Sequence, residues 1–238
     1  MNQTADGCTP VGEDQLVGEL ADLCEQRAHT YGLLSRLFRA EVDGGTLAQL
    51  REMKFPARTG SDVVDAGQRM MASYLAKSWG NTVTELAVDY ARTFIGHGVD
   101  AFSAAFPFES VYTSEKRLLM QEARDEVLAI YRSEGLEKAE TWREGEDHIA
   151  LELEFLQFMA ERTAQALRDG DESAAFRLLS VQRNFLTDHV CAWAPMMTLD
   201  MRKFAQTDFY QGLARIADGF LEGDRVFINE VLQDEEGE

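Results

Sequence analysis

Basic residues are scarce in this sequence. Lysine and arginine together number 23 against 42 aspartate and glutamate residues, so the formal net charge is -19 at pH 7. A charge of this sign repels phosphate backbones and anionic lipid headgroups, which argues against nucleic acid as a partner. It favours a basic ligand or peptide segment, although an acidic surface that only keeps the protein in solution would carry the same charge.

Cysteines are few and widely separated. Cys8, Cys24 and Cys191 form no Cys-x-x-Cys pair, so the sequence predicts neither a disulfide framework nor a zinc site, and a reducing compartment fits best. Residues 1–13 lack the basic and apolar regions of a secretory signal, and no apolar run is long enough to cross a membrane. We therefore expect a cytoplasmic protein that is neither exported nor inserted into a membrane.

The sequence signatures of several enzyme classes are missing. The chain has no G-x-x-x-x-G-K-[ST] phosphate loop, no G-x-S-x-G nucleophile turn and no Glu-x-x-His pair of the kind that di-iron helical bundles use. These absences argue against nucleotide hydrolysis, serine-hydrolase chemistry and a di-iron centre. The sequence thus favours a protein that is not a conventional enzyme.

Prolines are also few, and helical periodicity fills the stretches between them. The apolar pattern stops at each of the four, namely Pro10, Pro56, Pro107 and Pro195. Apolar residues recur every three or four positions in residues 15–39, 83–95, 119–130, 149–164 and 178–193. No segment alternates convincingly with the period of two that is typical of a strand. We predict an all-α fold.

Several helix ends can be predicted from local signals. Thr82 with Glu85 three residues later matches a capping box. Gly135 and Gly170 are placed to end helices in the left-handed conformation, and Asp171 is placed to begin the next helix as its N-cap. In residues 15–39, the face that carries Leu16, Leu20, Leu23, Arg27, Tyr31, Leu34 and Phe38 is predicted to be buried.

One compact helical domain is expected over residues 14–233. The chain is long enough to bury a sizeable core of this kind. A disordered tail is predicted at 1–13 and an acidic tail at 234–238, with two shorter amphipathic stretches before the latter. The polar connector at 134–146 separates two strongly helical stretches, and we expect it to act as a hinge.

Two short segments are the strongest candidates for a binding site. The first is Phe106–Tyr112 and the second is Glu144–Ile149. Aromatic residues beside acidic ones can build a groove for a peptide, with an apolar wall and an acidic rim. The candidate wall residues are Phe106, Phe108 and Tyr112, and the candidate rim residues are Glu109, Glu144, Glu146 and Asp147. The alternative is structural: the aromatics belong to the core, Ser110 caps a helix, Glu109 pairs with a cation and Tyr112 packs.

A second alternative is chemical. Asp147, His148 and Glu152 could form an acid–base or metal cluster, which would make the chain a metal-dependent helical hydrolase or oxidase. An acidic residue at a helix entrance is, however, commonly a cap, and a neighbouring histidine commonly has a structural partner.

Five motifs in order resemble the TorD/DmsD/NarJ family of cytoplasmic chaperones for molybdenum-containing oxidoreductases. They are Tyr31-x-x-Leu34-Ser35-x-x-Phe38, Asp89-Tyr90-x-x-x-Phe94-x-Gly96, Pro107-x-Glu109-Ser110-Val111-Tyr112, Asp147-His148-Ile149-x-Leu151-Glu152-Leu153-Glu154-Phe155 and Phe185-Leu186-x-x-His189-x-x-x-Trp193-x-Pro195. The resemblance extends over nearly the whole chain. It implies an all-α chaperone that binds the twin-arginine signal peptide or N-terminal region of a partner enzyme until cofactor insertion is complete.

The resemblance also implies a site and an assembly state. It implies that the loop around Pro107–Tyr112 and the pair Asp147 and His148 line the peptide site. Together with the wall and rim candidates above, the predicted peptide-binding residues are Phe106, Pro107, Phe108, Glu109, Ser110, Tyr112, Glu144, Asp147 and His148, and we expect no cofactor. The chain departs from the family pattern at Gly145, where a proline is common, and at Phe108, where a tryptophan often stands. If Asp147 contacts an arginine, Asp147→Asn should weaken binding about tenfold or more. A monomer or a domain-swapped homodimer is expected.

Overall fold

The computed structural model describes residues 12–56, 58–77, 80–96, 102–115 and 117–236. Within those ranges it is built from helices and contains no strand, so the expected all-α fold is confirmed. The elements in chain order are α1 Glu13–Arg39, α2 Gly44–Glu52, α3 Asp62–Ala76, α4 Thr82–Tyr90, η1 Ala91–Ile95, α5 Glu109–Thr113, α6 Glu122–Ser133, α7 Ile149–Arg168, α8 Glu172–Phe185, η2 Leu186–Val190, α9 Cys191–Phe204 and α10 Asp208–Glu236.

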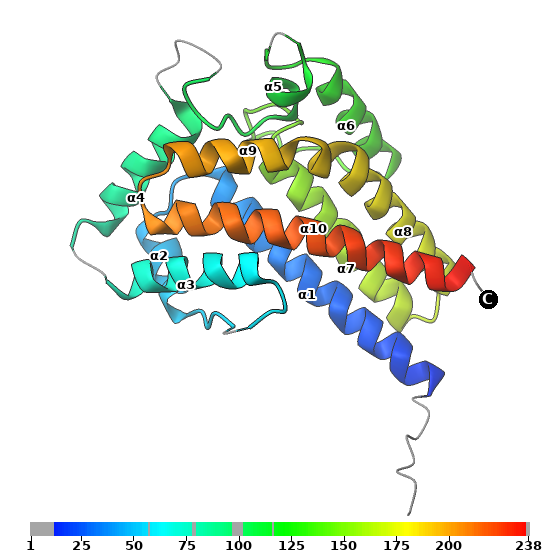
Figure 1. The fold of residues 1–238 in the computed structure, drawn as a ribbon. Coiled ribbons are helices and arrows are strands. Elements are labelled where there is room, and N and C mark those ends of the chain that lie inside the picture. The colour runs from blue at the N-terminus through cyan, green and yellow to red at the C-terminus, as the bar shows by residue number, and fades with distance from the viewer. Residues whose placement is uncertain (1–11, 57, 78–79, 97–101, 116, 237–238) are drawn as a thin grey trace, which may run out of the picture.

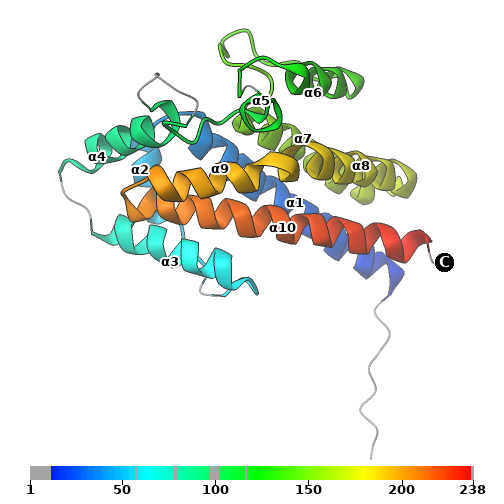
Figure 2. The ribbon, with the colours of Figure 1, turned by 45° about the horizontal axis from the view of Figure 1, so that its top comes forward.

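The long helices pack side by side around one apolar core. α1 packs along α7, and α10 packs along both α3 and α9 (Figure 1). The N-terminal end of α1 and the C-terminal end of α10 lie at the same end of the molecule, and α2 and α4 lie at the other (Figure 2). The large cluster of buried side chains between these helices makes a single compact domain, as the sequence predicts. No helix in the described part of the chain is long and apolar enough to span a membrane.

α7 is the central helix of the fold, and it covers the stretch 149–164 in which apolar residues recur. Buried residues occur on most of its sides, and they include Ile149, Leu153, Leu156 and Met159. Phe158 of the same helix is exposed. A helix that is apolar on most sides needs neighbours on most sides, and α1 and α8 supply them.

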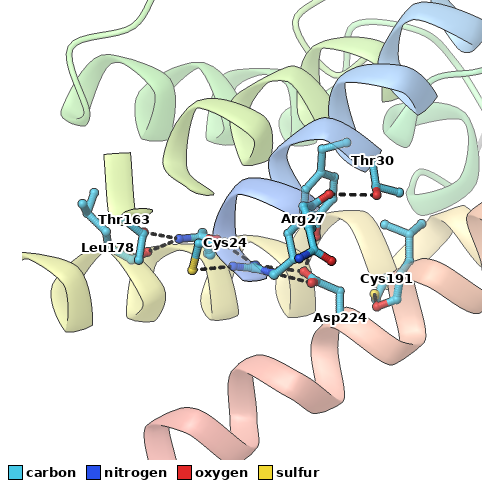
Figure 3. Close-up of polar contacts among 11 residues, drawn as sticks. Cys24, Arg27, Thr30, Thr163, Leu178, Cys191 and Asp224 are labelled. Atoms are coloured by element: carbon cyan, nitrogen blue, oxygen red, sulfur yellow. Dashed lines mark hydrogen bonds and ion pairs between the residues drawn. The ribbon is translucent and has the colours of Figure 1, made fainter. Parts of the chain in front are cut away.

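A buried polar network joins the two ends of the chain across the core. The guanidinium of Arg27 on α1 donates to the carboxylate of Asp224 on α10, with Nε 2.5 Å from Oδ1 (Figure 3). Tyr31 donates to the same carboxylate, with its hydroxyl 2.5 Å from Oδ2. Arg27 also donates to Gln182 of α8, which in turn donates to Thr163 of α7. Four helices are therefore held by one set of polar contacts.

Charge explains why Arg27 tolerates burial. Burial alone would lower its pKa, but the carboxylate of Asp224 outweighs this effect and raises the pKa above the usual value.

The first helix differs from the prediction that one continuous face would be buried. Arg27, Tyr31, Leu34 and Phe38 are buried, whereas Leu16 and Leu23 are exposed, because nearer the start of α1 the buried residues are instead Ala21 and Cys24, which cluster with apolar residues of α7 and α8.

Several predicted helix ends are confirmed. Gly135 and Gly170 have φ values of 71° and 76°, which is the left-handed conformation that glycine adopts without strain. Asp171 is the N-cap of α8 and accepts a hydrogen bond from the backbone N–H of Ala174. At α4, Thr82 is already the first helical residue, so the helix begins one residue earlier than the capping-box pattern predicts.

Pro195 does not end a helix, contrary to expectation. It lies inside α9, which continues to Phe204. Proline costs the helix the hydrogen bond that would otherwise reach the carbonyl four residues earlier, but Pro195 falls in the second turn of α9, and α9 itself follows the wider π-turn η2. The helix therefore continues through it.

The chain end also differs from the expected two short stretches. A single long helix, α10, begins at Asp208 and continues to Glu236, so the described residues of the acidic tail 234–238 are helical. Leu119, which was expected to begin the stripe of α6, instead precedes that helix and is exposed. The predicted N-terminal tail at 1–13 lies almost wholly outside the described residues.

Candidate functional site

The two candidate segments meet as a short antiparallel bridge. We call Pro107–Ser110 and Asp147–Ile149 together the bridge junction. Phe108 and His148 form the isolated β-bridge. The backbone N–H of Glu109 donates to the carbonyl of Asp147, and the N–H of Ile149 donates to the carbonyl of Pro107, each over 2.9 Å. The loop before α5 is thereby fixed to the start of α7.

Asp147 reinforces this junction with its side chain. Its Oδ2 accepts from the backbone N–H of Ser110 at 3.0 Å and from the Ser110 hydroxyl at 2.5 Å. The Ser110 hydroxyl oxygen then accepts from the backbone N–H of Gln121, just before α6. Oδ1 of Asp147 is buried and has no hydrogen-bond partner. Gly145 borders that atom, and a Cβ at position 145 would lie 2.7 Å from it.

His148 is the N-cap of α7. Its Nδ1 accepts a hydrogen bond from the backbone N–H of Ala150 over 3.0 Å, so the proton of the neutral ring lies on Nε2. The rings of Phe108 and Trp142 contact the imidazole edge-to-face, with centroids 4.9 Å and 5.2 Å away. Burial, with a smaller contribution from the charge of Arg39, lowers the pKa of His148 to about 3. The imidazole is therefore neutral at physiological pH.

This depressed pKa predicts an acid-sensitive fold. An unfolded histidine binds a proton below about pH 6.5, whereas folded His148 does so only near pH 3, so its contribution is present above pH 6.5 and is lost as pH falls. His148→Asn keeps a capping side chain but removes the titration. Between about pH 7.5 and about pH 5, the wild type should lose about 2 kcal/mol more unfolding free energy than the variant. Urea denaturation at both pH values measures this, and equal losses would contradict it.

A second group of buried ionisable residues lies behind α5. Nδ1 of His189 lies 3.2 Å from both carboxylate oxygens of Glu109. Burial alone would lower the pKa of His189, but the hydrogen bond and charge of Glu109 outweigh burial and raise it. Trp193 donates from Nε1 to Oε2 of Glu152 over 3.1 Å. Burial, together with the charge of Glu109, raises the pKa of Glu152 well above its usual value.

The expected site residues differ in how accessible they are. Phe106 and Tyr112 are half-buried, and Glu144 is exposed. The rest are buried, namely Pro107, Phe108, Glu109, Ser110, Asp147 and His148. All but Glu144 lie in or next to the bridge junction, but only its outer edge is open to a ligand in this conformation.

The structural alternatives for these residues are partly realised. Glu109 contacts His189, and Tyr112 stacks on Trp193 with ring centroids 5.6 Å apart and planes at 25°. Ser110 is not a helix cap, because Phe108 occupies the N-cap of α5. His189 and Trp193 belong to the fifth sequence motif, but periodicity alone places them in a core helix and gives no sign that they reach the loop.

The metal alternative does not match the local geometry. Asp147, His148 and Glu152 direct their polar atoms at different protein partners, respectively Ser110, Ala150 and Trp193. Among the described residues, no group of three or more His, Cys, Asp or Glu is arranged to hold a metal ion.

The other sequence motifs have structural roles around the same region. Asp89 accepts hydrogen bonds from the backbone N–H groups of Gln206 and Thr207 and so fixes the turn before α10. Ser35 donates to the carbonyl of Ala150 over 2.7 Å, which ties α1 to the start of α7. Residues of these motifs therefore fix the helices and turns around the bridge junction.

The amino-acid sequence matches a class of assembly chaperones. A family profile described as nitrate reductase delta subunit matches residues 61–198, which is more than half of the chain. The chain belongs to this TorD/DmsD/NarJ family of redox-enzyme maturation chaperones, a family of chaperones rather than enzymes.

Particular relatives are similar over most of their length. The chaperone protein TorD of Vibrio cholerae is 25% identical over 225 residues, covering 92% of this chain and 99% of the relative. TorD of Vibrio parahaemolyticus is 25% identical, covering 86% and 95%. TorD of Aliivibrio fischeri is 27% identical, covering 89% and 99%.

Proposed function

We propose that this chain is a cytoplasmic chaperone that binds the twin-arginine signal peptide, or the N-terminal region, of a molybdenum-containing oxidoreductase. It holds the client until cofactor insertion is complete. The observation that carries the proposal is the gathering of buried carboxyl groups at and behind the bridge junction. Glu109, Asp147 and Glu152 lie there, and among the described residues the histidine that pairs with one of these carboxylates is His189, which contacts Glu109. Such a region favours an added cation.

Asp147 is the best acceptor for a client arginine. Its Oδ1 is buried without a partner, although nearly all buried polar atoms in proteins make a hydrogen bond. A guanidinium carries five N–H donors in a flat fork that suits a carboxylate. Gly145 leaves the space beside Oδ1 free of a side chain. An arginine that reached this atom would satisfy it without displacing Ser110 from Oδ2.

The outer edge supplies the apolar part of the site. Phe106 and Tyr112 are half-buried and Glu144 is exposed, so these three are reachable without any change in conformation. The apolar stretch of a signal peptide packs against the aromatic rings, and local opening of the bridge junction admits an arginine to Asp147. The chaperone acts by shielding: it covers the apolar stretch and offsets the arginine charge.

Calorimetric titration tests this function. The ligand is the twin-arginine leader peptide of a molybdenum-containing oxidoreductase from the same genome, beside a version with both arginines changed to glutamine. We expect saturable binding, weakened about tenfold or more by the change, because each charge-assisted contact contributes about 1.5–3 kcal/mol. Asp147→Asn should weaken binding of the native leader similarly. Equal affinity for the two peptides would remove the acidic residues from recognition, and no binding would contradict the function.

The connector at 134–146 supports a second property, exchange between copies. Its two ends are tied to other elements, because Glu134 pairs with Arg177 of α8 and Glu146 pairs with Arg124 of α6. The same contacts can form between two chains if the connector extends, which gives a domain-swapped homodimer beside the monomer. Light scattering after size-exclusion chromatography distinguishes the two, and Glu146→Gln should shift their ratio. A single species for both proteins would contradict exchange at this hinge.

A further inference from the structure

Arg117 lies in an aromatic cage on the surface beside α5. We use this name for Phe102, Tyr112 and Asp200. The guanidinium carbon lies 4.6 Å from the centre of the Phe102 ring and 4.9 Å from that of Tyr112. Nη2 is 3.7 Å from Oδ2 of Asp200, which is too long for a hydrogen bond. Arg117 is thus held by ring faces and by charge, which is the pattern of a cation–π site.

The cage is supported without help from Arg117. Tyr112 stacks on the fully buried Trp193, and its hydroxyl donates to Oδ2 of Asp200 over 3.2 Å. Trp193 is fixed in turn by its hydrogen bond to Glu152. Two sides of the cage therefore rest on α5 and α9, directly in front of the buried carboxyl groups of the proposed peptide site.

Arg117 itself fits the cage poorly. Its Nε and Nη2 are buried and have no hydrogen-bond partner among the described residues. Its backbone φ is 51°, and that of Met120 is 55°; among the described residues these are the two non-glycine positions in the left-handed region. The three residues that follow Arg117 in this loop have exposed apolar side chains: Leu118 and Leu119 are each 50% exposed, and Met120 is 64% exposed. A loop with strained backbone conformations thus places Arg117 in the aromatic cage, where part of its guanidinium lacks hydrogen bonds.

We propose that the aromatic cage is a receptor for an arginine of the client peptide, and that Arg117 occupies it as an internal stand-in. The inference rests on the proposed peptide-binding function and specifies one subsite of it. A guanidinium is the ligand because that group already lies between the two rings and faces the carboxylate of Asp200. A client arginine is free of the strained loop and can approach Asp200 closely enough to donate two hydrogen bonds. Client binding therefore competes with Arg117.

Release of Arg117 also frees apolar surface. Leu118, Leu119 and Met120 follow Arg117 directly, so the loop that leaves the cage carries them with it. On α9, Met196 is exposed on the same helix face as Asp200, four residues before it, and Leu199, the residue next to Asp200, is also exposed. The apolar stretch of a signal peptide fits against these side chains while its arginine fills the cage.

Titration of the leader peptide into Arg117→Gln tests the competition. We expect this variant to bind the native leader about five- to tenfold more tightly than the wild type, because the internal competitor is gone. Arg117→Lys keeps the charge but lacks the flat fork, so it should strengthen binding to a smaller extent. Asp200→Asn should weaken binding. Arg51→Gln is the matched control: it removes one exposed positive charge on α2 and should leave the affinity within about twofold of the wild type.

The outcomes separate this inference from the proposed function. Tighter binding by Arg117→Gln but not by Arg51→Gln supports the stand-in. Equal gains in both variants would assign the effect to net charge and overturn it. Leader binding that is unchanged or weaker in both Arg117 variants would also overturn it while leaving the chaperone function intact. Loss of binding in every protein, the wild type included, would overturn both.

Discussion

Asp224→Ala should lower the free energy of unfolding by about 3–5 kcal/mol, the usual cost of leaving one partner of a buried ion pair alone. Arg27 is almost fully buried and has its bidentate partner in Asp224, with the two contacts at 2.5 Å and 3.0 Å. The change also leaves the hydroxyl of Tyr31 without its acceptor. Because α1 and α10 meet through this carboxylate, we expect the loss in the cooperative unfolding of the whole domain. Urea denaturation at neutral pH measures it.

The double variant Arg27→Met/Asp224→Leu is the matched control. It removes both charges and fills their space with apolar side chains, so no unpaired charge stays buried. It should recover at least half of the stability that Asp224→Ala loses. A loss below about 1 kcal/mol for Asp224→Ala would mean that water reaches Arg27 and that the network does not join the helices.

Asp147→Ala is expected to have the second-largest effect. Removing this side chain takes the acceptor from two donors of Ser110, its backbone N–H and its hydroxyl, both of which are buried. Unsatisfied buried donors of this kind should lower the unfolding free energy by about 2–4 kcal/mol. The bridge junction should also open more often, which faster amide hydrogen exchange at Glu109 and Ile149 would report.

Asp147→Asn separates stability from recognition. It keeps one carbonyl oxygen for Ser110, so its loss of stability should be less than half that of Asp147→Ala, while its effect on leader binding should remain. A double-mutant cycle with Ser110→Ala measures the direct coupling, expected at about 1–3 kcal/mol. If Asp147→Ala unfolds at the same urea concentration as the wild type, the side chain does not hold the junction.

Much of the helical architecture can be predicted from the sequence because periodicity and caps are local signals. The stripe of α7, the left-handed glycines 135 and 170 and the N-cap at Asp171 are all confirmed. The predictions that fail are those in which burial or a helix end depends on residues far away in the sequence. Leu23 has the same helical spacing as buried Tyr31 but is exposed, because at its level the buried face of α1 passes through Ala21 and Cys24, which cluster with residues of α7 and α8. Pro195 is a residue that usually ends a helix, but α9 continues through it to Phe204.

The candidate site was only partly accessible to sequence reasoning. The motifs name the loop at Pro107–Tyr112 and the start of α7 as parts of one candidate site, and the structure pairs these two segments directly. Which atoms they leave exposed depends on packing against α8 and α9, and no spacing rule contains that information. The same holds for Arg117, because its cage draws on three separate segments. Left-handed φ values at arginine and methionine have no sequence signature.

The bridge junction has a consequence for how the chain can be divided. It joins Ser110 to Asp147, 37 positions further along the chain, and so closes a loop of the chain that contains α5, α6 and the connector. The two sides of the connector are each anchored to the opposite part of the protein, through Glu134 to Arg177 and through Asp147 to Ser110. A cut between α6 and α7 would therefore leave two fragments that recognise each other, so the protein is suited to reconstitution from separately produced halves.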